Sequence, residues 1–270
     1  MIFSIFIYEQ VGQFSTQHLL TIAICFALIA LFPVLGNMLS ANHRRFVELF
    51  VVAFGLLQEV VDYTNRFLVR GLNFSEDLPL HICNIMFYVG LIFMVTKSQF
   101  LFELLYLVGL GAAFITILTP EFKMINHIDY ILFFFYHGLI VAIALWGVFV
   151  NKMKPRKKSI RNAYLCLWAL TIPVGLVSWI VDGNYMFLMK SPTVSNPLVF
   201  GDWPFYIINI SVISLIIMFI AFYHSDLTVL TPDDRDQLQF YIFWHRAWYL
   251  PNNYIDILAF NTIFWKKIFE

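Results

Sequence analysis

The sequence predicts an all-α integral membrane protein, a seven-transmembrane-helix bundle with a C-terminal interfacial helix. Of the 270 residues, 60% are hydrophobic and only 13% are charged, which is too few charges to cover a water-soluble domain of this size. Apolar stretches of roughly 20 residues, the length that crosses a hydrocarbon core, recur along the chain. Aromatic residues make up 19% of the sequence, as expected where side chains face lipid or the membrane interface.

Seven apolar stretches are interpreted as membrane spans, in order 18–39, 46–68, 80–96, 100–118, 130–150, 161–181 and 203–223. The third and fourth are short and are separated by only Lys97-Ser98-Gln99, which predicts an antiparallel helical hairpin. No internal repeat or low-complexity linker divides the spans, so residues 1–223 are expected to form one membrane domain. Residues 1–8 are apolar but lack a basic segment and a cleavage site, and are not expected to be a signal peptide.

Basic residues between the fifth and sixth spans predict the orientation. Residues 151–161 contain six of them: Lys152, Lys154, Arg156, Lys157, Lys158 and Arg161. Short loops rich in lysine and arginine stay in the cytoplasm. With seven spans, this loop places the N-terminus outside the cell and the C-terminus in the cytoplasm.

Residues 224–270 form an aromatic-rich tail that is predicted to be cytoplasmic. Thr231, Pro232 and Asp233 are typical of a helix start, and they predict a helix over about 232–250. Its aromatic residues favour a helix lying in the membrane interface, although an arm packed against the bundle is an equally good interpretation.

Polar side chains within or near the spans are candidate site residues, because burying such groups in a bilayer is costly. Most of them fall near the outer ends of the predicted spans, and the candidates are Glu59, Asp62, His81, Cys83, Asn84, Tyr136, His137 and Tyr185. This distribution predicts a polar pocket that opens outward. A thiol and an imidazole from different helices, here Cys83 and His137, can act as a nucleophile and its base.

Each candidate also has a purely structural interpretation. A single membrane cysteine usually fills space, and a single histidine usually bonds a neighbouring helix. The two carboxylates, Glu59 and Asp62, are one turn apart and can pair with Arg66 or Arg70. His81 can cap the third span, and Tyr185 can anchor its loop at the interface.

Six short motifs occur in a fixed order along the chain: Leu78-Pro79-Leu80-His81-Ile82-Cys83, Glu103-Leu104-Leu105-Tyr106, Leu118-Thr119-Pro120, Phe134-Phe135-Tyr136-His137-Gly138, Gly183-Asn184-Tyr185-Met186-Phe187-Leu188 and Trp203-Pro204. Over about residues 15–223 they resemble the YwaF family of bacterial integral membrane proteins. That family is related to eukaryotic transmembrane acyltransferases that remodel ether phospholipids. The resemblance implies a multi-pass protein of the bacterial plasma membrane.

In the eukaryotic relatives, a cysteine and a histidine in the matching motifs are taken as the catalytic pair, and they correspond to Cys83 and His137. The reaction implied is acyl transfer from a donor phospholipid to a lysophospholipid through a cysteine thioester. Asn84, Tyr136 or Tyr185 would then donate hydrogen bonds to the oxyanion. Glu59 or Asp62 would orient the imidazole, as the third member of a catalytic triad does.

Two other function classes remain open from the sequence. Zinc held by Glu59, Asp62, His81 and His137 would make a membrane lipid hydrolase. Polar residues in an outward pocket would also suit a small-solute transporter. We expect no cofactor, and the expected partners are membrane phospholipids and lysophospholipids. The zero net charge gives no reason to expect nucleic acid.

Overall fold

The computed structural model describes residues 11–120, 124–192 and 199–228, and all regular structure within these ranges is helical. The predicted interfacial helix at about 232–250 lies outside the described residues. The tail was expected to begin at residue 224, but the last helix continues to Thr228.

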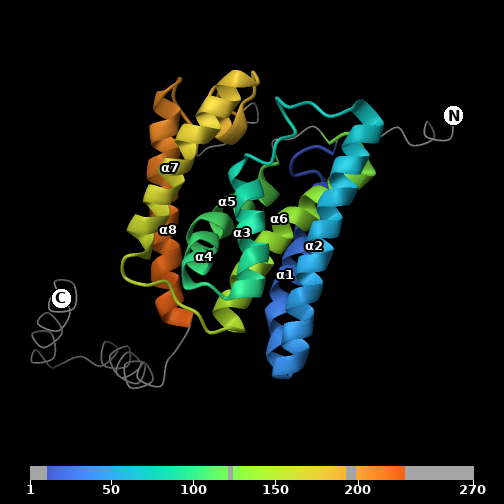
Figure 1. Cartoon of the computed structure of the whole chain (residues 1–270), viewed down its shortest axis with the longest axis vertical. Coiled ribbons are helices and arrows are strands. Elements are labelled where there is room, and N and C mark those ends of the chain that lie inside the picture. The colour runs from blue at the N-terminus through green and yellow to red at the C-terminus, as the bar shows by residue number, and fades with distance from the viewer. Residues whose placement is uncertain (1–10, 121–123, 193–198, 229–270) are drawn as a thin grey trace, which may run out of the picture. The chain divides into compact units, whose positions relative to one another are not determined.

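The helices follow the apolar stretches closely (Figure 1). They are α1 (Thr16–Met38), α2 (Ala41–Arg70), α3 (Ile82–Thr96), α4 (Gln99–Leu104), η1 (Leu105–Gly109), α5 (Leu110–Leu118), α6 (His127–Phe149), α7 (Ser159–Ile180), η2 (Tyr185–Phe187) and α8 (Phe205–Thr228). The segments α4, η1 and α5 form one continuous rod with a π-helical turn at η1. Lys97 adopts a left-handed conformation and separates α3 from this rod, as the short connection predicted.

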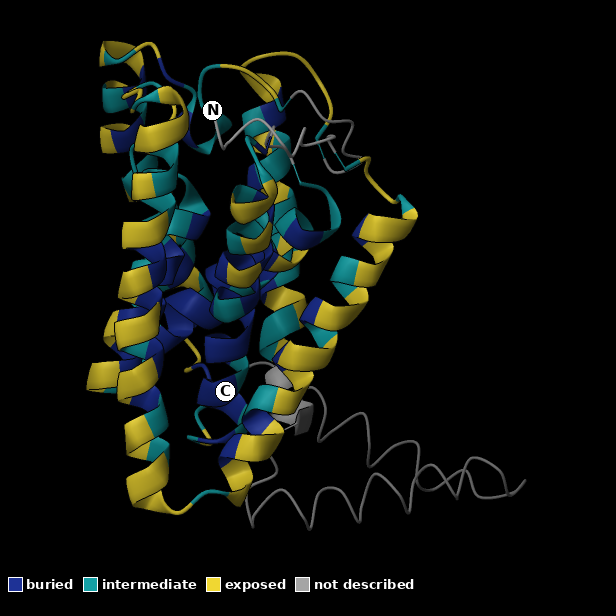
Figure 2. Cartoon of the chain, turned by 90° about the vertical axis from the view of Figure 1, so that its right-hand side faces the viewer, coloured by how far each residue is buried: buried dark blue, intermediate teal, exposed yellow. Residues whose placement is uncertain are grey.

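Five helices in the described part of the chain are long and apolar enough to cross a membrane: α1, the α4–α5 rod, α6, α7 and α8. Their outward faces expose large apolar side chains. Figure 2 shows that many residues on the outer sides of the helices are exposed. The protein is therefore a membrane protein whose described residues form only helices. Of the other two predicted spans, α2 carries several charged residues and α3 has only 15 residues.

The centre of the bundle is α6, which packs against α1, α2, α3 and the rod. Trp146 of α6 is fully buried, and its Nε1–H donates to Glu48 Oε1 of α2 at 3.0 Å. Gly36 of α1 faces this indole, and a Cβ atom there would lie 2.4 Å from the ring. A larger residue at position 36 would therefore push α1 away from α6.

Polar contacts tie the helices together at both ends of the bundle. At one end, Arg156 in the connection between α6 and α7 makes a two-pronged ion pair with Glu103 of α4, at 2.8 and 2.9 Å. At the other end, the amides of Asn65 and Asn126 join the end of α2 to the start of α6. The candidate site lies at this second end.

Candidate functional site

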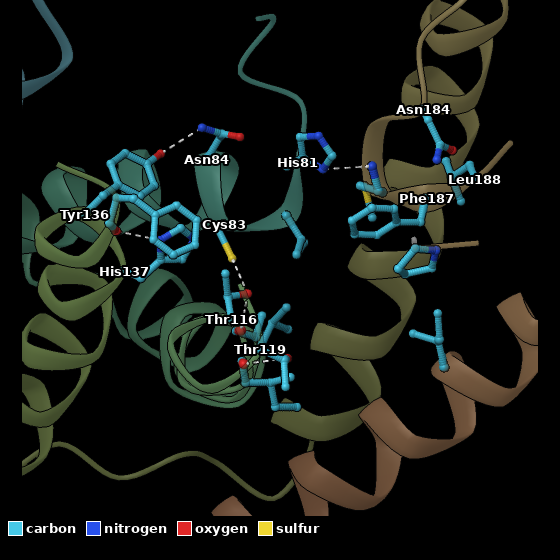
Figure 3. A pocket seen from close by; sticks show the side chains of 18 of the residues that line it. His81, Cys83, Asn84, Thr116, Thr119, Tyr136, His137, Asn184, Phe187 and Leu188 are labelled. Atoms are coloured by element: carbon cyan, nitrogen blue, oxygen red, sulfur yellow. Dashed lines mark hydrogen bonds between the residues drawn. The ribbon is translucent and has the colours of Figure 1, made fainter. Parts of the chain in front are cut away.

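A cavity of about 800 Å³ opens among α2, α3, α5, α6, α7 and α8, and the segment 75–78 and η2 contribute to its rim. Seven predicted site residues line it: Glu59, Asp62, His81, Cys83, Asn84, Tyr136 and His137. Tyr185 is not among the lining residues. The structure therefore brings the thiol and the imidazole into the wall of one cavity, from α3 and α6 (Figure 3).

Cys83 is the second residue of α3 and is buried. Its sulfur lies 3.8 Å from Thr116 Oγ1 on α5, and Figure 3 shows the sulfur directed toward this threonine. The Thr116 hydroxyl donates its only hydrogen to the carbonyl of Ala112 at 2.9 Å. Thr116 therefore accepts from the thiol, and the sulfur carries a hydrogen.

His137 is held by its own helix. Its Nδ1 lies 2.8 Å from the carbonyl oxygen of Phe133, one turn earlier in α6. A carbonyl can only accept, so Nδ1 is the protonated nitrogen, and Nε2 of the neutral ring carries a lone pair. This is the tautomer that a general base at Nε2 requires.

Asn84 and Tyr136 meet across the cavity wall. The Asn84 amide donates to the Tyr136 hydroxyl at 3.1 Å (Figure 3). The tyrosine ring stacks on Phe87 with ring centres 4.1 Å apart. Because the Tyr136 oxygen accepts this bond, its own hydrogen remains able to donate to another group. The pair thus presents a fixed O–H donor close to the start of α3.

His81 and Tyr185 connect the start of α3 to η2. The backbone N–H of Met186 donates to His81 Nδ1 at 3.3 Å. The Tyr185 hydroxyl donates to the Phe74 carbonyl at 2.7 Å and accepts from the Leu78 N–H at 2.8 Å. His81 is the N-cap residue of α3, but its side chain makes no capping hydrogen bond. Tyr185 therefore fixes the segment before α3 and does not face the cavity.

The two carboxylates of α2 have partners other than the imidazole. Glu59 accepts a hydrogen bond from the Tyr88 hydroxyl, and Asp62 forms an ion pair with Arg66 at 2.9 Å. Because the Phe133 carbonyl occupies Nδ1 of His137, neither carboxylate orients the ring through that nitrogen. The triad arrangement expected from the sequence is replaced by a backbone carbonyl.

Asp77 connects the segment before α3 to α2. Its carboxylate pairs with Arg70 at 2.6 Å and with Arg66 at 3.2 Å, and it accepts from the Asn73 N–H at 2.7 Å. Burial alone would raise the pKa of Asp77, but these three donors together lower it below the ordinary value. The ion pairs therefore hold the cavity rim in place at neutral pH.

Two polar atoms at the cavity have no hydrogen-bond partner among the described residues. They are Gln58 Oε1 and Arg66 Nε, and both side chains line the cavity. Buried polar groups are normally satisfied by protein, water or a ligand. The polar end of the cavity is thus suited to water or to a polar part of a ligand.

The metal alternative needs a cluster of ligands that the structure does not assemble. Among the described residues, no three His, Cys, Asp or Glu side chains are arranged to hold a metal ion. In particular, Glu59, Asp62, His81 and His137 all line the cavity without forming such a group.

Comparison with known proteins identifies the family. The model of the TMEM164 family matches residues 13–223, which are most of the chain. The chain belongs to the TMEM164 family. An uncharacterized protein of Treponema pallidum (strain Nichols) is 25% identical over 126 residues, which cover 46% of this chain and 52% of that protein. No solved structure matches the chain. The family region includes the whole cavity wall and ends within α8, at residue 223.

Proposed function

We propose that the protein is a membrane-embedded phospholipid acyltransferase that works through an acyl-cysteine intermediate. One observation carries this proposal: Cys83 and His137 line the same cavity, and the hydrogen bond at Nδ1 leaves Nε2 of the imidazole without a proton. Membership of the TMEM164 family is consistent with the relation to eukaryotic transmembrane acyltransferases that the motifs imply. We also propose that the chain is related to the YwaF family, as its motifs suggest.

In the first half-reaction, His137 Nε2 takes the thiol proton of Cys83. The thiolate attacks the carbonyl carbon of a phospholipid ester and forms a carbon–sulfur bond. The ester carbon–oxygen bond then breaks, and His137 returns the proton to the departing lysophospholipid oxygen. The product is a thioester on Cys83.

In the second half-reaction, the hydroxyl of a second lysophospholipid gives its proton to His137 Nε2 and attacks the thioester. The carbon–sulfur bond breaks, and the thiolate recovers the proton from the imidazolium. Water in place of the lysophospholipid would give a free fatty acid. Neither half-reaction requires a cofactor.

Two sources of positive potential would stabilise the oxyanion. Cys83 lies in the first turn of α3, where the backbone N–H groups have no carbonyl partner within the helix. The Tyr136 hydroxyl, held by Asn84, offers one further donor. Tyr185 is withdrawn from this role because its hydroxyl is already bonded on both sides.

We further propose seven spans in the bacterial plasma membrane, with the N-terminus outside and the C-terminus in the cytoplasm. At about 1.5 Å per residue, the 30 residues of α2 are long enough to cross a core of about 30 Å. The helix α3 has only 15 residues, and we propose that part of the irregular segment 71–81 before it completes this crossing of the membrane. Irregular backbone is tolerated at membrane depth where it lines a watery cavity.

A transporter would need a polar path that reaches both faces of the membrane. The charged residues that line the cavity lie on α2, on residues 75–77 and at the start of α6, all toward one end. At the opposite end, the aromatic side chains of Phe93, Phe102 and Trp146 are fully buried in the described bundle, and no residue of that end lines the cavity. This asymmetry favours a lipid-modifying pocket over a transport path.

The proposal is tested by mass spectrometry of the purified protein after incubation with phospholipid vesicles. We expect an acyl adduct on Cys83 that hydroxylamine removes, as a thioester requires. Cys83→Ala should form no adduct and transfer no acyl group.

The other two cysteines provide matched controls. Cys25 is buried between α1 and α6, where its sulfur lies 3.7 Å from the Phe134 carbonyl, and neither it nor Cys166 lines the cavity. Cys25→Ala and Cys166→Ala should keep the adduct and the activity. Full acyl transfer by Cys83→Ala would rule out the thioester mechanism.

A further inference from the structure

The cavity has an apolar extension that the site chemistry does not use. One face of the η1–α5 rod, one turn of α7 and one face of α8 line it. Its main apolar side chains are Val108, Ala112, Ile115, Trp168, Ile210 and Ile217. We call this extension the acyl trough.

We propose that the acyl trough binds one hydrocarbon chain of a phospholipid and measures its length. This inference deepens the proposed function and rests on it, because it assigns the acyl-chain subsite of the same cavity. The ligand class is a long unbranched fatty acyl chain, with the ester at Cys83 and the chain extending away from it along α5 and α8.

The trough begins at the nucleophile. Thr116, which accepts from the Cys83 thiol, is the neighbour of Ile115 and lies one turn from Ala112 on the same face of α5. An acyl carbonyl placed at the sulfur would therefore have its chain directed onto this face.

The trough offers a ligand almost no hydrogen-bonding group. Charged cavity residues are absent from the described parts of η1, α5, α7 and α8. The hydroxyls of Thr116, Thr119, Thr171 and Ser214 each donate to a carbonyl of their own helix. Ser211 accepts from the Trp168 indole. Because these hydroxyl groups are engaged within the protein, a headgroup or a polar solute would lose hydrogen bonds there, whereas a hydrocarbon chain would not.

The length and the closed end of the trough fit one lipid leaflet. From Thr116, where the trough begins, to Leu107, the lining face of the rod spans about 14 Å of helix. Half of a hydrocarbon core is about 15 Å. At the deep end, a Cβ atom added to Gly111 would lie only 2.7 Å from Ile217 Cγ2, so α5 and α8 are in close contact there. Nearby, the Tyr106 hydroxyl donates to the Ala221 carbonyl at 3.1 Å. The helices α8 and η1 thus close the trough and set its depth.

Photocrosslinking tests the trough without any turnover. The probe is phosphatidylcholine with a diazirine in the middle of one acyl chain, incorporated in vesicles that contain the purified protein. We expect crosslinked peptides from residues 107–115 and 210–217, in wild type and in Cys83→Ala alike. Ile210→Trp should fill the trough and reduce these crosslinks by roughly tenfold or more, as steric changes in apolar pockets do.

Ile216→Trp is the matched control, since Ile216 lies on the same helix, is 53% exposed and does not line the cavity. It should leave the crosslinks unchanged. A smaller change, Ile217→Ala, should shift the bound acyl chains toward greater length without risk of overpacking. Crosslinks spread evenly over the lipid-facing helices, with no response to Ile210→Trp or Ile217→Ala, would overturn the acyl trough.

The same experiment separates the two proposals. If the crosslinks map to the trough but no acyl adduct forms on Cys83, the trough stands and acyl transfer fails. If the adduct forms with the same chain-length profile in wild type, Ile210→Trp and Ile217→Ala, acyl transfer stands and the trough fails.

Discussion

The thiol hydrogen of Cys83 points to Thr116, and the imidazole lone pair of His137 is free at Nε2. In the proposed reaction the two groups are therefore prepared separately, the thiol by a contact with α5 and the imidazole by the preceding turn of α6. Moving the thiol hydrogen from Thr116 to the imidazole breaks only one weak hydrogen bond. Thr116 thus acts as a positioning residue, whereas His137 would take part in the chemistry.

This difference predicts unequal effects of two substitutions. His137→Ala should slow acylation of Cys83 by about 10²–10⁴-fold, the usual contribution of a general base. Thr116→Val keeps the shape but removes a neutral hydrogen bond of about 0.5–1.5 kcal/mol, so the rate should change by no more than about tenfold. Rapid quenching and mass spectrometry of the acyl adduct give both rates. An equally large loss in Thr116→Val would show that Thr116 participates in proton transfer.

At the scale of elements, the site depends on the irregular segment that leads into α3. Tyr185 of η2 satisfies the Phe74 carbonyl and the Leu78 N–H with one hydroxyl group. Tyr185→Phe leaves both backbone groups without that partner, at a cost of about 1–3 kcal/mol for an unpaired buried group. We expect a lower midpoint of thermal unfolding in detergent. Tyr223→Phe, at a side chain that is 64% exposed, should leave the midpoint unchanged, and equal effects of the two would contradict this role.

Asp77 makes the same segment sensitive to acid. Its pKa is lower in the folded protein than in the unfolded chain, so its ion pairs add stability above the unfolded value of about 3.9. That contribution should persist at neutral pH and disappear as the pH falls through the lowered folded pKa. Unfolding midpoints measured from pH 7 to pH 3 should fall more for wild type than for Asp77→Asn. Parallel pH curves for the two proteins would show that Asp77 does not contribute in this way.

The helices and most cavity residues were predictable from sequence, because apolar length and isolated polar residues are local signals. Seven of the site residues predicted in this way line the cavity. Tyr185 was misplaced, since a loop tyrosine gives no sign of whether its hydroxyl faces the cavity or the backbone. Thr116 and the Phe133 carbonyl were missed. The only signal for Thr116 is a single hydroxyl between Ile115 and Ile117, and a backbone carbonyl has no sequence signature at all.

At the scale of the whole molecule, polar contacts show which segments lie together at each end of the bundle. Arg45 at the start of α2 donates to the Met94 carbonyl near the end of α3, at 3.2 Å, and Arg156 pairs with Glu103 of α4. At the opposite end, Arg66 and Arg70 pair with Asp77. The structure thus separates position 43 and the 151–161 connection from position 76 along the bundle axis.

This separation gives a test of the number of membrane crossings. Single cysteines replace His43, Glu76 or Lys157, all exposed, in a background that lacks Cys25, Cys83 and Cys166. With seven spans, both α2 and α3 cross the membrane, so Glu76→Cys lies on the side opposite to His43→Cys and Lys157→Cys. With five spans, neither helix crosses, and all three positions lie on the same side.

For seven spans, an impermeant maleimide applied to intact cells should label Glu76→Cys alone, while lysed cells should show all three labelled. Labelling of His43→Cys and Lys157→Cys without Glu76→Cys would keep seven spans but place the cavity mouth toward the cytoplasm. Identical labelling of the three would leave five spans, with the cavity open to the same side as the basic connection.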